Sequence, residues 1–121
     1  MALFHHVNLG VPAGGLEAQS AFLVNLLGFR SIDPGPELRD RATWFEGEDG
    51  VQIHLSVDPE HRAPARAHVA MAFGDDLDAL EERLLAAEVK VNVLRAEPMR
   101  VVGCRDPSGN LWELRGTDTA G

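Results

Sequence analysis

The stretch HVNLGV at residues 6–11 decides how this chain folds, because a related stretch, HVAMAF, begins 62 residues later at residue 68. Apolar side chains alternate with polar or small ones in both stretches, and this period of two is typical of a strand with one buried face. A second pair of similar segments, QIHL at residues 52–55 and LWEL at residues 111–114, is offset by 59 residues. Two nearly equal offsets indicate an internal repeat.

The first half of the chain is predicted to form a strand, a helix and three more strands. The helix carries leucines at helical spacing and ends before Gly28, a residue type that often terminates helices. In the last strand, apolar residues occupy the odd positions from Val51 to Val57, so Gln52, His54 and Ser56 share the other face. The predicted elements are residues 4–11, 16–27, 30–33, 42–46 and 51–57.

The second half is predicted to repeat this order. After the strand at residues 68–73, Asp75 or Asp76 would cap a helix that runs towards Lys90. Three further strands are predicted, with a turn at residues 106–110 before the last. These strands are residues 91–94, 100–105 and 111–115, and the inner stripe of the helix is Leu77, Leu80, Leu84 and Ala87.

Together these patterns predict an α+β fold made of two paired βαβββ modules. The modules are residues 1–58 and 68–116, and the linker between them is residues 59–67, which hold two prolines and show no apolar periodicity. A length of 121 residues is typical of one domain, so residues 1–121 are expected to form a single unit.

Composition excludes several classes of partner. Eleven Lys and Arg residues against nineteen Asp and Glu residues give a net charge of −8, which repels nucleic acids and anionic membrane surfaces. The single cysteine allows no internal disulfide, and no stretch approaches the length of an apolar membrane span. The protein is therefore expected to be cytoplasmic and to act on a small molecule, with no nucleic-acid or membrane partner.

Four residues remain on the polar faces once apolar positions are assigned to the core. They are His6, His54, His68 and Glu113, and all four are types that bind divalent metals. If the modules pair through these faces, the four side chains would converge on one ion and leave two coordination positions open for a substrate. One carboxylate leaves a divalent ion with a formal charge of +1, which favours an anionic ligand that chelates through two adjacent oxygens.

The chain resembles the vicinal oxygen chelate superfamily, which comprises glyoxalase, bleomycin-resistance and extradiol dioxygenase proteins. The resemblance covers nearly the whole chain, and its most specific motif is DPSGNLWEL at residues 106–114. The other matching motifs are HVNLGV at residues 6–11, GF at 28–29, WF at 44–45, QIHL at 52–55, HVA at 68–70 and DLD at 76–78. His54 departs from the Glu or Gln that is commonest at its position.

The resemblance implies a cup that holds a divalent Zn, Ni, Co, Mn or Fe ion, in a chain that forms a homodimer. It places His6, His54, His68 and Glu113 at the ligand positions and implies lyase or isomerase chemistry, in which Glu113 would serve as the catalytic base. Two other functions stay open: a metal-free protein that binds and sequesters an antibiotic, and an extradiol-type dioxygenase. The absence of tyrosine argues against the dioxygenase.

A further group of residues is expected to bind the substrate. Gln52 and Ser56 share a strand face with His54, and Trp44 and Arg100 lie in other predicted strands. Arg100 would act there as a clamp for an anion. Cys104 is expected to be a small buried apolar residue, since no base is assigned beside it.

Overall fold

The structure is a computed structural model that describes residues 1–96 and 98–116. It divides into two compact units, Met1–Arg62 and Ala63–Gly121. Residues 58–67, which join the last strand of the first unit to the first strand of the second, contain turns but no helix or strand. That both units form one domain stays a prediction.

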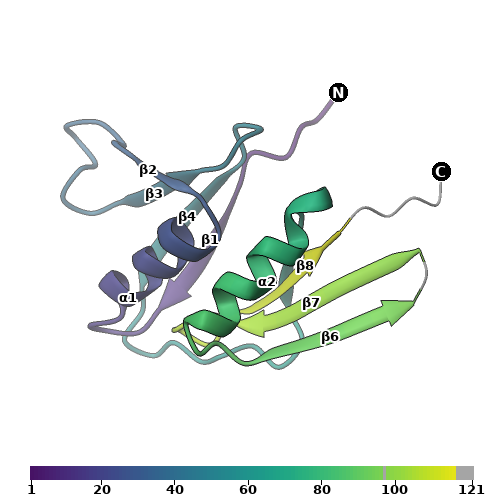
Figure 1. Cartoon of the computed structure of the whole chain (residues 1–121). Coiled ribbons are helices and arrows are strands. Elements are labelled where there is room, and N and C mark those ends of the chain that lie inside the picture. The colour runs from purple at the N-terminus through teal and green to yellow at the C-terminus, as the bar shows by residue number, and fades with distance from the viewer. Residues whose placement is uncertain (97, 117–121) are drawn as a thin grey trace. The chain divides into compact units, whose positions relative to one another are not determined.

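The first unit is a sheet of four strands with one helix (Figure 1). Strand β1 (His6–Val11) leads into helix α1 (Leu16–Ala21), which continues as a π-helical segment, η1 (Phe22–Leu26). Strands β2 (Arg30–Ile32), β3 (Thr43–Glu46) and β4 (Gln52–Val57) follow. The order in the sheet is β1-β4-β3-β2, with β1 parallel to β4 and the other neighbours antiparallel.

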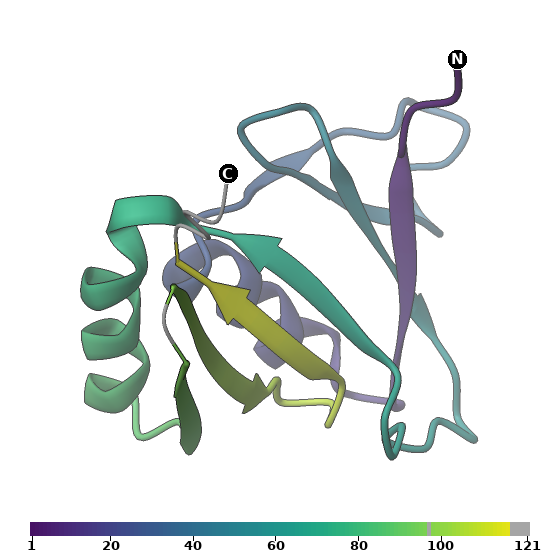
Figure 2. The ribbon, with the colours of Figure 1, turned by 90° about the vertical axis from the view of Figure 1, so that its right-hand side faces the viewer.

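The second unit has the same topology. Strand β5 (His68–Ala72) is followed by a 3₁₀ turn, η2 (Gly74–Asp76), and by helix α2 (Leu77–Ala86), which runs beside its sheet in Figure 2. Strands β6 (Val91–Ala96), β7 (Met99–Arg105) and β8 (Leu111–Arg115) complete it in the order β5-β8-β7-β6. The two predicted βαβββ modules are confirmed.

The register of the strands is also repeated. In the first unit Asn8 of β1 lies opposite His54 of β4, and in the second unit Ala70 of β5 lies opposite Glu113 of β8. In the first unit, His6 thus lies two positions before the residue opposite His54. In the second unit, His68 lies two positions before the residue opposite Glu113.

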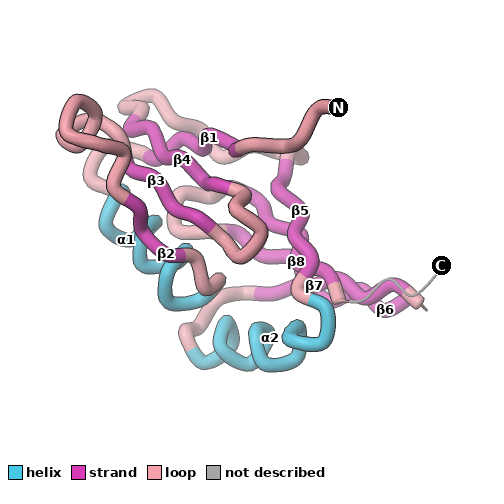
Figure 3. Tube along the Cα trace, turned by 90° about the horizontal axis from the view of Figure 1, so that it is seen from above, coloured by secondary structure: helices cyan, strands magenta, loops and turns pink. Residues whose placement is uncertain are grey.

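Alternation along the strands decides which face each helix covers. In β4 Ile53 and Leu55 are buried, and in β8 Trp112 and Leu114 are buried, while the residues between them remain partly exposed. In each unit the helix lies on one side of its own sheet (Figure 3), as expected when a sheet and a helix bury one apolar face each. The buried apolar residues on the helices are Phe22, Leu23, Leu77, Leu80 and Leu84.

Three details of the predicted elements are wrong. Val57 was expected on the buried face of its strand, but it ends β4 and is 52% exposed. Helix α2 stops at Ala86 rather than near Lys90, so Ala87 is an exposed cap residue and not part of the apolar stripe. Asp76 stands at the start of α2, but its side chain makes no capping hydrogen bond.

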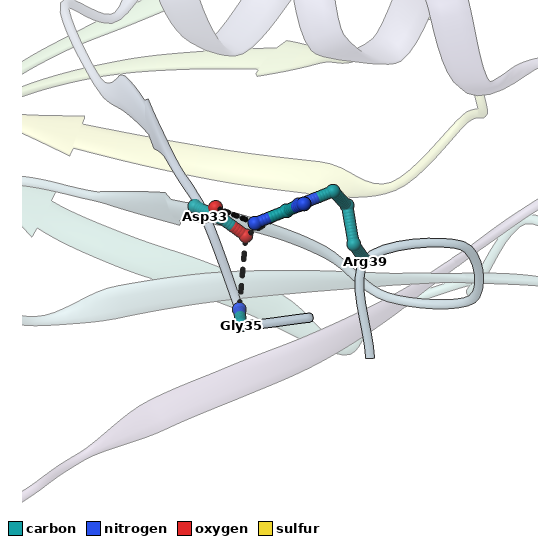
Figure 4. Close-up of polar contacts among 3 residues, drawn as sticks. All are labelled: Asp33, Gly35 and Arg39. Carbon is teal, nitrogen blue, oxygen red and sulfur yellow. Dashed lines mark hydrogen bonds and ion pairs between the residues drawn. The ribbon is translucent and has the colours of Figure 1, made fainter. Parts of the chain in front are cut away.

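The loop after β2 is held by one carboxylate, Asp33 (Figure 4). Its Oδ1 accepts the backbone N–H of Gly35 at 2.9 Å, and its Oδ2 accepts Nη2–H of Arg39 at 2.6 Å. The hydrogen bond from Arg39, followed by that from Gly35, lowers the pKa of Asp33.

The described residues contain no helix with the length and apolar character that a membrane span needs.

Candidate functional site

The polar face of the first sheet gathers the predicted site residues of that unit. Gln52, His54 and Ser56 alternate along β4 with the buried residues and so share one face. The strand register places His6 of β1 opposite Gln52, and Trp44 of β3 opposite His54. Within the first unit no helix lies on this face, because α1 covers the buried side of the sheet.

Three rings form a stack on this face. The His54 ring lies between two others, with ring centroids 3.8 Å from His6 and 4.3 Å from Trp44, and the interplanar angles are 16° and 7°. The stack holds His54 in one orientation from both sides. Trp44 therefore lies beside His54, and its predicted contact with a substrate stays a prediction.

A hydrogen bond selects the nitrogen of His54 that is open to a metal. Nε2 lies 2.8 Å from Oε1 of Gln52, and since an amide oxygen only accepts, Nε2–H is the donor. The lone pair of His54 is then on Nδ1. Burial, followed by the charges of His6 and His5, lowers the pKa of His54, so the ring favours the neutral form that a metal requires.

The stacked rings of His6 and His54 are not arranged to share an ion. A metal bound to imidazole lies near the ring plane, about 2 Å from the nitrogen. Two rings whose centroids are 3.8 Å apart and whose planes differ by 16° have planes that do not meet within that reach. At least one ring must turn out of the stack if both are to bind the same metal.

The pair in the second unit is arranged differently. Nε2 of His68 lies 3.3 Å from Oε2 of Glu113, and the two side chains are 43% and 28% exposed. Adjacent ligands of one ion are roughly 3 Å apart when each metal–ligand bond is about 2.1 Å long. The two atoms therefore already have the separation of neighbouring ligands.

A second hydrogen bond fixes the tautomer of His68. Its Nδ1 lies 2.9 Å from the backbone oxygen of Arg66, and because a carbonyl only accepts, Nδ1–H is the donor. In the neutral ring the lone pair is then on Nε2, which faces the carboxylate of Glu113. Two acceptors face each other at this point, so a proton or a metal ion fits between them.

Glu113 has a further partner that was not predicted from the sequence. Nη1 of Arg115 donates to Oε1 of Glu113 at 2.6 Å. The two residues are two positions apart in β8 and hence share a face, which is the only signal in the sequence for this contact.

Two predicted substrate-binding residues have other partners. Arg100 pairs with Asp78 at 2.5 Å and with Glu81 at 2.8 Å, both on α2, so it lies on the helix-covered face and not on the face of Glu113. The two negatively charged carboxylates on the helix hold the guanidinium there, and the predicted role of Arg100 as an anion clamp stays a prediction. Ser56 shares the face of His54, but it donates to Oδ1 of Asn8 at 3.0 Å.

The structure thus provides one pair of candidate ligands in each unit. Taken separately, neither unit gathers three or more His, Cys, Asp or Glu side chains that fit a metal, among the residues described. The convergence of His6, His54, His68 and Glu113 on one ion stays a prediction.

Cys104 is buried as expected, and burial, followed by the charge of Asp106, raises its pKa to about 11.

Comparisons with known proteins agree with this topology. The sequence profile of the Glyoxalase/Bleomycin resistance protein/Dioxygenase superfamily matches residues 3–114. A glyoxalase family protein from Bacillus anthracis is 26% identical, with a TM-score of 0.85, and the match covers 97% of this chain and 96% of that one. The search of curated proteins gave no match.

Two more distant solved structures share the fold. Lactoylglutathione lyase from Agrobacterium tumefaciens is 20% identical, with a TM-score of 0.71 and coverage of 100% of this chain and 98% of that one. A mutant of the fosfomycin resistance protein FosX from Listeria monocytogenes, solved with Mn(II) and 1S,2S-dihydroxypropylphosphonic acid, is 22% identical. Its TM-score is 0.74, and the match covers 95% of this chain and 92% of that one.

Proposed function

The chain belongs to the Glyoxalase/Bleomycin resistance protein/Dioxygenase superfamily, and on that premise we propose that it is a metal-dependent enzyme of the lyase or isomerase type. His6, His54, His68 and Glu113 would hold one divalent ion. The substrate would be a small molecule that offers two adjacent oxygens to the open coordination positions.

The pair of His68 and Glu113 carries this proposal. The donor atoms are 3.3 Å apart, and the Arg66 carbonyl holds the His68 ring so that its Nε2 lone pair points at the carboxylate. A hydrogen bond of this kind is the usual support of a histidine that binds a metal. A surface histidine without a ligand needs no such fixed tautomer.

The donor set fits a divalent ion in its chemistry. Three neutral imidazoles and one carboxylate suit Zn, Ni, Co, Mn and Fe alike, so the residues do not choose among these metals. The FosX mutant from Listeria monocytogenes was solved with Mn(II) and a phosphonic acid that bears a vicinal diol. In that protein the same fold accommodates a divalent ion and a small oxygenated ligand.

The residues of this chain would have two roles, to hold the divalent ion and to transfer a proton. When bound, a divalent ion supplies Lewis-acid stabilisation of negative charge on a substrate oxygen. His68 keeps its lone pair towards the site through the bond of Nδ1–H to Arg66. One oxygen of Glu113 would accept a proton from the carbon beside that substrate oxygen, while Arg115 steadies the carboxylate.

The test is to bind a chelator to metal-loaded protein. Protein purified without an affinity tag is loaded with Co²⁺, and its visible spectrum is followed while acetohydroxamate is added. We expect a saturable spectral change at one equivalent per chain, since a hydroxamate fills two adjacent positions. The Glu113→Ala variant should lose the bound cobalt.

Two results would contradict the proposal. Cobalt that binds but gives no response to acetohydroxamate would indicate a closed structural site. Protein that takes up none of the five metals after supplementation would support the metal-free binding protein instead.

A further inference from the structure

Arg115 is the cation placed to meet a substrate beside Glu113. It shares the open face of β8 with Glu113 and is 28% exposed. The other arginines of this sheet are placed differently: Arg100 pairs with α2, and Arg105 donates to the backbone oxygens of Pro64 and Gly109 at 2.7 and 2.8 Å. Arg95 lies opposite Arg100 and hence on the same face as Arg100.

The positions beside Glu113 carry little side-chain bulk. Across the sheet, Glu113 lies between Ala70 of β5 and Gly103 of β7. The equivalent neighbours of His54 in the first unit are Asn8 and Trp44, which are both larger. The same register therefore holds a crowded ring stack in one unit and an open stretch of sheet in the other.

Neither backbone conformation nor crowding requires glycine at position 103. Gly103 is not among the described glycines with positive φ. A Cβ built there would meet only two backbone oxygens, at 3.7 Å in Asn92 and 3.9 Å in Trp112, which are ordinary contact distances. Because glycine weakens the interior of a strand, it often marks a bulge, a bend or a place that a ligand or another backbone approaches closely, and the unbroken pairing from Val101 to Arg105 excludes the bulge.

We propose that the substrate carries an anionic group, a carboxylate or a phosphonate, beside its chelating oxygens, and that Arg115 binds this group while the substrate lies over Gly103. The inference rests on the proposed function of the same site and names its substrate class. A guanidinium pairs with either anion through two parallel hydrogen bonds. Residues two apart on a strand are roughly 7 Å apart, which suits an anion one or two carbons from the chelating group.

The experiment compares three hydroxamates on Co²⁺-loaded protein. Acetohydroxamate has no charged tail, malonic acid monohydroxamate has a carboxylate, and phosphonoacetohydroxamate has a phosphonate. We expect at least one charged probe to bind about tenfold or more tightly than acetohydroxamate, as one charge-assisted pair allows. The tighter probe identifies which anion the site prefers.

Variants test whether the tighter binding of charged probes depends on Arg115 itself or on positive charge in general. Arg115→Gln should abolish the preference, measured within the variant as the ratio of charged-probe to acetohydroxamate affinity, because the substitution also removes a hydrogen bond from Glu113. Arg95→Gln, which removes the same charge from the opposite face, should keep the preference. Gly103→Val should weaken all three hydroxamates without lowering the melting temperature, because valine favours strands.

The outcomes distinguish this inference from the proposed function. If acetohydroxamate binds and the charged probes bind no better, the anionic substrate is wrong and the metal site stands. An equal loss of preference in Arg95→Gln and Arg115→Gln would also overturn it, as would unchanged hydroxamate binding in Gly103→Val. If no hydroxamate binds at all, the proposed function has failed as well.

Discussion

Asp106 organises the turn between β7 and β8 through a carboxylate that is only 5% exposed. Its Oδ1 accepts the backbone N–H groups of Ser108 and Asn110, and its Oδ2 accepts the indole N–H of Trp112, all at 2.9 Å. The bond to Trp112 links the turn to the core of the second unit. The turn is followed by β8, the strand that bears Glu113.

Replacement of this carboxylate should be costly. Asp106→Ala is expected to lower the free energy of unfolding by about 3 kcal/mol, because three donors lose a charged acceptor. Urea unfolding monitored by circular dichroism measures the change. The control Asp49→Ala removes an exposed carboxylate from a turn of the first unit and should change the value by less than about 0.5 kcal/mol. Similar losses in the two variants would show that Asp106 has no special role.

Cys104 should be chemically inert in the folded protein. Its pKa of about 11, against the model-compound value of 9.0, makes the thiolate roughly 100-fold scarcer at pH 8 than in an unfolded chain. Iodoacetamide should therefore label the native protein at least that much more slowly than protein in urea. Labelling at equal rates would mean that the thiol is neither buried nor shifted.

The same shift predicts a loss of stability in alkali. The unfolded chain releases the thiol proton near pH 9 and the folded chain near pH 11, so the contribution of Cys104 is complete below pH 9 and is lost as the pH rises through 11. The chain contains no tyrosine, which keeps the background small. Urea unfolding from pH 8 to 11 should show a shallower decline for Cys104→Ala; an identical decline would exclude the thiol as its source.

At the scale of the elements, helix α2 ends in a strained residue. Glu88 has φ of +62°, its N–H donates to Leu85 at 3.0 Å, and the N–H of Val89 donates to Leu84 at 2.9 Å. These two bonds form the motif that usually has glycine in the left-handed position. Glu88 therefore carries a conformational cost that glycine would relieve.

Glu88→Gly should stabilise the protein. The expected gain in the free energy of unfolding is about 0.5–1 kcal/mol, even though glycine makes the unfolded chain more flexible. Glu82→Gly, at an exposed position within the same helix, should instead cost about 1 kcal/mol. Thermal melting of both variants decides the matter: a lower melting temperature for Glu88→Gly would rule out relief of strain.

The predicted elements succeeded where a local pattern determines the structure. Alternation predicted β4 and β8 within one residue, because burial of one sheet face imposes a period of two on the sequence. The end of α2 was missed because Glu88 replaces the expected glycine, so its left-handed conformation leaves no trace in the residue type. Val57 was missed because β3 ends opposite Leu55, so Val57 has a neighbouring strand on one side only.

At the scale of the whole molecule, the repeat made the candidate ligands predictable. The equal register of the two sheets places His6 and His68 at equivalent positions, and likewise His54 and Glu113. Side-chain partners were not predictable to the same degree. Arg100 pairs with α2 and Arg115 pairs with Glu113. Each of these ion pairs depends on the face of the sheet that the arginine occupies and on the carboxylates within reach on that face.

The central proposal is that His6, His54, His68 and Glu113 hold one divalent ion. The most direct measurement is the metal content of tag-free protein after Zn²⁺ loading and desalting, for the wild type and for His6→Ala, Glu113→Ala and His61→Ala. We predict one zinc per chain in the wild type and in His61→Ala, which removes a histidine outside the proposed set, and near-complete loss in the other two. A full equivalent of zinc retained by either His6→Ala or Glu113→Ala would contradict the claim.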